Sequence, residues 1–163
     1  MIIGYEDGDW VSLALLAIKN KAPLWFAHGC NCQKLEDNGG IAGQVKERIP
    51  ALYRTEMIAN TNQTGNLSYY LPNGNNHSLV LINLYTQFYG GDDADLIHIA
   101  KCFEKLEQIY TRIKNAGGNK QLPQELVIPQ IGTGIGGLKW SDVSRVIDES
   151  TPTLPVRVIK WNG

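Results

Sequence analysis

The sequence predicts an α/β domain, a three-layer α/β/α sandwich around a mixed, largely parallel, six-stranded sheet. Short apolar segments that suit buried strands alternate with segments whose apolar residues recur at helical spacing, which is typical of layered α/β proteins. Two glycine-rich loops also follow such strands and precede such helices. The 163 residues contain no linker and no internal repeat, so we expect one domain spanning 1–163.

The first half of the chain supplies two strands and two helices. We expect an edge strand at Met1–Tyr5, a nearly all-apolar helix at Val11–Asn20 and a strand at Leu24–His28. The next helix is expected to stop near Pro50. Its apolar residues recur every four positions and so form one face: Ile41, Val45 and Ile49.

Two strands and the longest helix follow. Ser68–Leu71 and Leu79–Leu84 suit strands, and the polar residues 72–76 between them suit a turn. We expect a long helix at Asp95–Asn115, with Gly117 just beyond its end. One face of this helix carries an apolar stripe: Leu96, Ile99, Ala100, Phe103, Leu106, Tyr110 and Ile113.

The last third of the chain repeats the strand–loop–helix–strand pattern. Glu125–Ile128 is expected to be a strand that runs into the glycine-rich loop Gln130–Gly137. Ser141 is expected to cap a short helix, because serine accepts hydrogen bonds from the first backbone N–H groups of a helix. That helix carries Val143, Val146 and Ile147, and Val156–Trp161 closes the fold as a final strand.

Composition and charge exclude several classes of function. A net charge of -1 gives no electrostatic footprint for duplex nucleic acid, and no apolar run is long enough to cross a membrane. The acidic start of the chain is unlike a signal peptide, so we expect a cytoplasmic protein. An odd number of cysteines, Cys30, Cys32 and Cys102, then indicates reduced thiols. The pair beside His28 lacks a second group of ligands, so neither a metal nor a cofactor is expected.

The two glycine-rich loops indicate phosphate binding. Residues 38–42 (Asn-Gly-Gly-Ile-Ala) and 132–137 (Gly-Thr-Gly-Ile-Gly-Gly) each lie between a strand and a helix. Such loops expose backbone N–H groups beside a positive helix N-terminus, although either alone could be a tight turn. Together they predict a cradle for a diphosphate. Neither loop is a Walker A motif, and a dinucleotide fingerprint is missing after the first strand.

The order of these motifs resembles the macro domain family. The matching stretches are Gly8-Asp9-Trp10, residues 27–32 leading to 38–42, residues 83–87 and residues 128–140. The sequences of residues 28–32 and of Thr86-Gln87 are most similar to those of the branch that contains ADP-ribose-1″-phosphate phosphatases and related phage proteins. The resemblance implies a small-molecule ligand, ADP-ribose or a derivative, free or on an ADP-ribosylated protein.

The resemblance also implies roles for single residues. Asp9 matches the acid that accepts a hydrogen bond from adenine, with a helix cap as the alternative, and Trp10, which adjoins it, is expected among the ligand-binding residues. Asn31 matches the asparagine beside the distal ribose. Trp161 sits where relatives place an aromatic against adenine, with a plain core or surface aromatic as the alternative. One phosphate loop comprises Gly39, Gly40, Ile41 and Ala42, and the other Gly132, Thr133, Gly134, Ile135 and Gly136; Ile41 and Ile135 would be apolar lids.

Catalysis is the more open question. Asp37, in the charged insert 33–37, falls where hydrolytic branches place a loop acid, so it is the candidate base beside Asn31. His28 is either a proton donor or a buried core histidine. One hydrolase branch of the family uses a lysine on the middle strand and an aspartate in the last loop. This chain has Thr86-Gln87 and Gly136 at those places, so that mechanism is not expected. Two functions stay open: hydrolysis of a distal-ribose substituent, and non-catalytic binding of ADP-ribose or another NAD-derived nucleotide.

Overall fold

The structure is a computed structural model that describes residues 1–32, 40–58, 64–88, 94–133 and 136–161. Six strands form one sheet in the order β1-β6-β5-β2-β4-β3. All neighbours are parallel except β3 and β4, which pair antiparallel. The mixed, largely parallel sheet is therefore confirmed, with β1 at one edge as expected. The strands are β1 (Ile2–Asp7), β2 (Leu24–Asn31), β3 (Leu67–Tyr70), β4 (Val80–Gln87), β5 (Glu125–Pro129) and β6 (Val156–Lys160).

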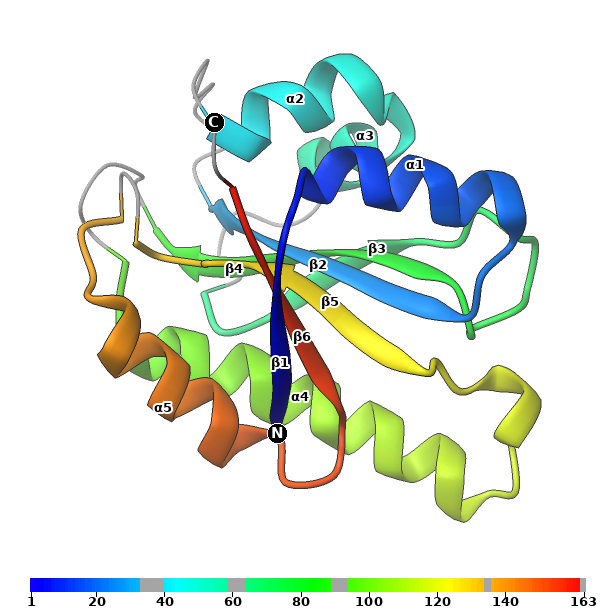
Figure 1. Cartoon of the computed structure of the whole chain (residues 1–163). Helices are drawn as coiled ribbons and strands as arrows, with labels where there is room; N and C mark the ends of the chain where they lie inside the picture. The colour runs from blue at the N-terminus through cyan, green and yellow to red at the C-terminus, as the bar shows by residue number, and fades with distance from the viewer. Residues whose placement is uncertain (33–39, 59–63, 89–93, 134–135, 162–163) are drawn as a thin grey trace.

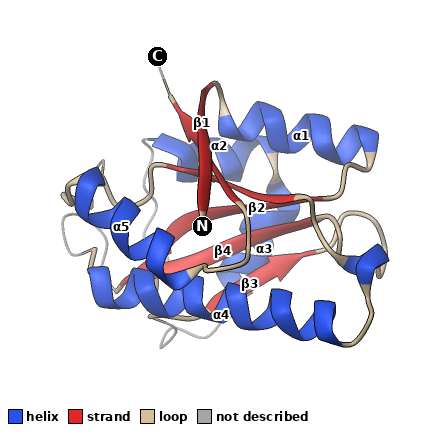
Figure 2. Cartoon of the chain, turned by 60° about the horizontal axis from the view of Figure 1, so that its bottom comes forward, coloured by secondary structure: helices blue, strands red, loops and turns tan. Residues whose placement is uncertain are grey.

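Helices cover both faces of the sheet, which confirms the three layers (Figure 1). On one face lie α1 (Trp10–Asn20), α2 (Gly40–Arg48) and α3 (Pro50–Ile58). On the other lie α4 (Leu96–Asn115) and α5 (Trp140–Ser150), which pack against each other (Figure 2). A short 3-10 turn, η1 (Asn119–Gln121), follows α4. Each layer of helices encloses its own apolar core against the sheet.

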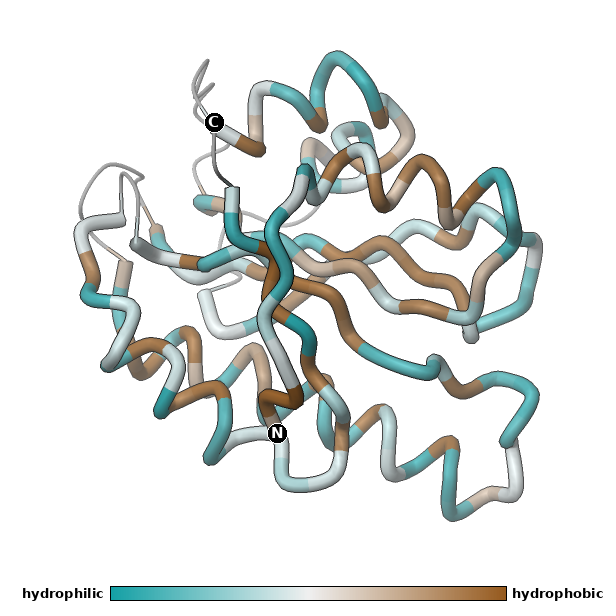
Figure 3. Tube along the Cα trace, viewed as in Figure 1, coloured by the Kyte–Doolittle hydropathy of each residue, from teal (hydrophilic) through white to brown (hydrophobic). Residues whose placement is uncertain are grey.

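The strands in the middle of the sheet carry the apolar residues that the sequence predicts. Figure 3 shows this band of hydrophobic residues running through the centre of the molecule. Seven of the eight residues of β4 are buried, as expected for a strand covered on both faces. No helix in the described ranges is long and apolar enough to cross a bilayer.

The expected end of the helix near Pro50 is confirmed, because α2 ends at Arg48, but the sequence analysis missed the second helix, α3, that begins at Pro50. Proline suits the first position of a helix, where its missing N–H has no intrahelical partner to lose. The expected cap of α5 was wrong: Ser141 does not cap the helix, since Lys139 occupies the cap position and offers no side-chain hydrogen bond.

The apolar stripe of α4 contains one buried acid, Glu107, that the apolar pattern did not predict. Its carboxylate accepts hydrogen bonds from the backbone N–H groups of Thr153 (2.9 Å) and Leu154 (2.8 Å), and from the Thr153 hydroxyl. Burial alone would raise the pKa of Glu107, but these donors outweigh it and lower the pKa. The acid therefore fixes the chain just before β6 against α4.

Candidate functional site

A cavity of about 430 Å³ lies at the carboxyl ends of β2, β4, β5 and β6. Ligands of open α/β sheets collect at this edge, beyond the strands. Both predicted phosphate loops reach the cavity, so segments more than 80 residues apart in the sequence meet there. Its described lining is His28, Gly29, Gly40, Ile41, Ala42, Thr86, Gln87, Pro129, Gln130, Ile131, Gly132, Thr133, Gly136, Ile159 and Trp161.

The loop after β5 is folded tightly on itself. The Leu138 N–H donates to the Gly132 carbonyl oxygen (2.9 Å), and the Thr133 hydroxyl donates to the Gln130 carbonyl (2.8 Å). Gly132 has a φ of +78°, which glycine adopts without strain. A Cβ atom on Gly136 would lie 2.7 Å from the Gly132 oxygen. Glycine at 136 is therefore required by the close approach of two stretches of backbone.

The loop after β2 reaches the cavity through the first turn of α2. Gly40 begins this helix with a φ of +64°, and Ile41 and Ala42 follow it on the cavity wall. The first N–H groups of a helix have no partner within the helix, and the helix dipole adds positive charge there. This wall can therefore donate hydrogen bonds to an anion. Gly39 lies outside the described residues.

The floor of the cavity is formed by residues that the sequence interpretation did not assign to the site. A Cβ atom on Gly29 would lie 3.0 Å from the Thr86 hydroxyl and 3.2 Å from a methyl group of Ile131. A larger residue at position 29 would require these neighbours in β4 and the β5 loop to move by a few tenths of an ångström. The unassigned lining residues are Gly29, Thr86, Gln87, Pro129, Gln130, Ile131 and Ile159. All seven lie within two residues of the carboxyl end of a strand, which is the signal that could have found them.

His28 lines the cavity but its side chain is almost fully buried, with 1% exposed. Its Nε2 lies 2.7 Å from Asn83 Oδ1. The Asn83 amide group donates to the Leu52 carbonyl (3.3 Å) and to the Ser68 hydroxyl (3.1 Å), so its oxygen accepts from His28. Burial lowers the pKa of His28 to about 4 despite this hydrogen bond. The ring is thus neutral near pH 7, which favours the core histidine over the proton donor.

Trp10 lies in the core rather than on the cavity wall, which corrects its assignment to the ligand-binding residues. Its indole N–H donates to the Val127 carbonyl (3.0 Å), and its ring packs edge-on against Phe26. The His28 ring lies 5.4 Å from it, centroid to centroid. Trp10 supports the floor of the cavity from behind and is not among the described residues that line it.

Asp9 is the N-cap of α1, the alternative that the sequence left open. Its Oδ1 accepts from the N–H groups of Val11 (3.0 Å) and Ser12 (3.4 Å), and its Oδ2 lies 3.1 Å from the Arg48 guanidinium. Burial alone would raise the pKa of Asp9, but the hydrogen bonds from Ser12 and Arg48 lower it. Asp9 is not among the described lining residues.

The remaining predicted residues divide into three groups. Trp161 follows β6, is 60% exposed and lines the cavity, so it fits a ligand-facing aromatic. Asn31 ends β2 opposite Gln87 of β4, but it is not among the described lining residues. Four predicted residues lie outside the described residues: Asp37, Gly39, Gly134 and Ile135.

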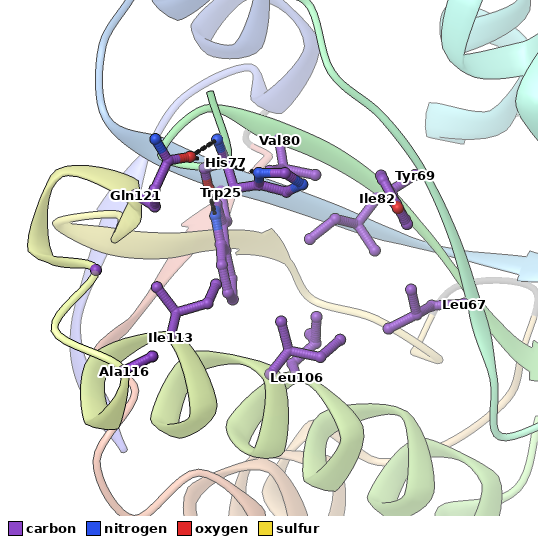
Figure 4. A pocket seen from close by; sticks show the side chains of 12 residues that line it. Trp25, Leu67, Tyr69, His77, Val80, Ile82, Leu106, Ile113, Ala116 and Gln121 are labelled. Atoms are coloured by element: carbon purple, nitrogen blue, oxygen red, sulfur yellow. Dashed lines mark hydrogen bonds between the residues drawn. The ribbon is translucent and has the colours of Figure 1, made fainter. Parts of the chain in front are cut away.

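A second cavity, of about 460 Å³, opens between α4 and the β3–β4 pair (Figure 4). Trp25 and Leu106 contribute to its apolar walls, and His77 and Gln121 lie at one end. None of its described lining residues is Lys, Arg, Asp or Glu, and it touches neither glycine loop. It offers nothing that would hold a diphosphate, so the cavity at the strand ends is the candidate site. No group of three His, Cys, Asp or Glu side chains in the described ranges is placed to hold a metal ion.

The fold and this site can be compared with known proteins. No family model matches the sequence. An uncharacterised 17.5 kDa protein of Enterobacteria phage T4 is 28% identical over 165 residues, which cover 99% of this chain and 97% of the phage protein.

Solved structures match over nearly the whole chain. The macrodomain of Thermus aquaticus DarG matches with a TM-score of 0.69 and 20% identity, over 100% of this chain and 99% of that one. A Trypanosoma brucei macrodomain in complex with ADP-ribose matches with a TM-score of 0.60 and 14% identity, over 97% of this chain and 63% of that one. The order of the strands, the two layers of helices and this agreement lead to one conclusion: the chain has the macrodomain fold.

Proposed function

We propose that the chain binds ADP-ribose or a close derivative of it in the cavity at the strand ends. One observation carries the proposal: described residues of the two glycine-rich loops, distant in sequence, line one cavity. Backbone N–H groups of both loops suit the two phosphates of a diphosphate, and the start of α2 adds positive charge. A macrodomain of the same fold has been solved with ADP-ribose, which supports the choice of ligand.

The ligand has a preferred direction in this cavity. The diphosphate would lie between residues 40–42 and the loop from Gly132 to Gly136. The adenine would lie against Trp161, the exposed aromatic of the lining, because planar bases stack on such rings. The distal ribose would then point toward the end of β2, where Asn31 lies.

Thermal unfolding tests the proposal. A ligand that binds only the folded state raises the melting temperature by mass action. ADP-ribose should do so, and AMP should do so much less because it lacks the diphosphate that spans the two loops. Equal shifts for AMP and ADP-ribose, or no shift for either, would contradict the site.

We further propose that the bound ligand loses a substituent of the distal ribose, as in ADP-ribose-1″-phosphate hydrolysis. The supporting observation is that Asn31 ends β2 at the edge of the sheet that holds the cavity, and the charged segment 33–37 follows it in the sequence. Asp37 would be the base that activates water. His28 is a poor acid for this step, because its pKa of about 4 leaves it without the extra proton near pH 7.

Release of inorganic phosphate from ADP-ribose 1″-phosphate tests this second step. Asp37→Ala and Asn31→Ala should keep most of the binding and lose turnover, which is the pattern of groups that act mainly in the transition state. Asp142→Ala, in the first turn of α5 and outside the described lining of the cavity, is the matched control and should keep both. A wild type that binds tightly but releases no phosphate would identify a binding module instead.

A further inference from the structure

The second cavity, between α4 and the β3–β4 pair, has walls that belong to the core of the fold. Val80 and Ile82 of β4 line it from the sheet, and Leu106 and Ile109 of α4 line it from the helix. All of them except Ile109 are buried, so packing fixes both walls. Its volume of about 460 Å³ lies within the range of small-molecule sites, about 300–1,000 Å³, and exceeds the voids that close-packed side chains leave.

A buried tryptophan forms one side of this cavity. The Trp25 indole N–H donates to the His77 carbonyl (2.7 Å), and its ring packs edge-on against Tyr110, with 6.2 Å between the ring centroids. Figure 4 shows the indole standing along the cavity. Because its N–H is already used, the ring presents a fixed aromatic surface, which suits a planar aromatic ligand.

The His77 ring places a hydrogen-bond acceptor at the rim of the cavity. The His77 backbone N–H donates to the Gln121 side-chain oxygen (2.7 Å), which identifies that atom of the amide as the acceptor. Nδ1 of the ring lies 3.4 Å from the same oxygen, so Nδ1 carries the hydrogen of the neutral ring. Nε2 is then an acceptor, and it has no partner in the described part of the chain. Figure 4 shows the ring between Gln121 and Tyr69, so Nε2 is placed to meet a ligand.

The lining also determines the charge of a suitable ligand. None of the described lining residues is Lys, Arg, Asp or Glu. An ion in this cavity would lose its hydration without gaining an opposite charge. A neutral molecule avoids this cost, and one polar group on it can pair with His77.

We propose that the second cavity binds a small, neutral, planar aromatic molecule that carries one hydrogen-bond donor, such as a hydroxyl group. The rings lie against Trp25 between the sheet and α4, and the donor faces Nε2 of His77. The site is separate from the cavity at the strand ends, since the two share no described lining residue. The proposal therefore does not depend on ADP-ribose binding.

Fluorescence anisotropy of 2-naphthol, a planar aromatic alcohol, tests the proposal, because a small fluorophore tumbles more slowly when it is bound. The signal should saturate at one 2-naphthol per chain. The methyl ether, 2-methoxynaphthalene, lacks the donor and should bind about three- to tenfold more weakly, the equivalent of one net hydrogen bond. His77→Phe should remove this difference, because it deletes the acceptor but keeps a ring and both backbone contacts of residue 77. His98→Phe, on α4 outside the described lining, is the matched control and should preserve the difference.

A further pair of variants tests the place of binding. Ile109→Trp fills the cavity from α4 and should abolish saturable binding of 2-naphthol, whereas Ile97→Trp, at an exposed position of the same helix, should keep it. Thermal unfolding without ligand shows whether each variant folds. His77 is exposed, so His77→Phe stays informative even where Ile109→Trp does not fold.

Three results would overturn the site: no saturable binding by the wild type, binding that survives in folded Ile109→Trp, or displacement of 2-naphthol by ADP-ribose. Equal wild-type affinities for the alcohol and the ether would overturn the role of His77. Whether ADP-ribose itself binds is measured separately by its own thermal shift, so failure of one site leaves the other standing.

Discussion

Gly136 is the residue where the smallest change should have the largest effect on the site. A Cβ atom there would lie 2.7 Å from the Gly132 oxygen and 2.9 Å from the Ala94 side chain. Gly136→Ala should therefore force the β5 loop open, lower the stability by about 1–3 kcal/mol and abolish ADP-ribose binding. Urea unfolding and calorimetry measure the two effects.

Gly4→Ala is a suitable comparison, because the added Cβ would meet only the flexible end of Arg157 at 3.1 Å. It should keep ligand binding and most of the stability. Full binding by Gly136→Ala would contradict the expectation that a side chain at position 136 opens the loop.

His28 should make the stability depend on pH. The unfolded chain binds a proton on this ring below about pH 6.5, whereas the buried ring resists it until about pH 4. Stability should therefore fall as the pH drops through this window, by up to about 3 kcal/mol. His28→Gln keeps a donor for Asn83 and lacks the titration. Urea midpoints across the window should fall less steeply for the variant, and identical slopes would contradict the shift.

At the residue scale, the sequence predicted the residues whose role depends on the backbone. It did not predict the direction in which a side chain within a motif points. Gly40, Gly132 and Gly136 were expected at the site because their role depends on local backbone space, and these three line the cavity. Trp10 was placed with the ligand because it adjoins Asp9 in a short motif. The sequence alone does not show that a helix turns the Trp10 ring inward, where its N–H bonds to Val127.

Among the elements, α4 can be altered without touching the site. Leu106 is buried against the sheet on the face opposite α1 and α2. Leu106→Ala should cost about 2–5 kcal/mol, because the second cavity beside it would grow rather than collapse. Ile97→Ala, at an exposed position of the same helix, should change the stability by less than about 0.5 kcal/mol. Thermal unfolding measures both, and a loss of ADP-ribose affinity in folded Leu106→Ala would contradict the separation of the two faces.

The strands and helices were predictable where the pattern of apolar residues fits only one kind of element. The strands appear as short apolar segments and α4 as an apolar stripe at helical spacing, and the structure has all six strands and α4. The region after α2 does not meet this condition, because the proline that marks the end of α2 can also begin a new helix, and α3 does begin at Pro50. Leu52 is buried in the core below α1 and α2 in the structure, and that tertiary contact stabilises α3.

At the scale of the whole molecule, the site is a product of topology. Parallel strands bring their carboxyl ends to one edge, so two loops that follow β2 and β5 must become neighbours. This much follows from the sequence pattern. The floor of the cavity does not, because Gly29, Thr86 and Ile131 meet only through the strand order β5-β2-β4.

The distribution of the tryptophans gives the protein an optical signal of its own. Trp10 and Trp25 are buried in the two cores, whereas Trp161 is largely exposed at the cavity. Emission from a solvent-exposed indole depends on its contacts, so stacking of an adenine on Trp161 should quench part of the fluorescence. Trp161→Phe should abolish this response while the emission of the buried indoles still reports the folded state. Unlabelled protein would then suffice to screen nucleotides in a fluorimeter, and a response that survives Trp161→Phe would place the base elsewhere.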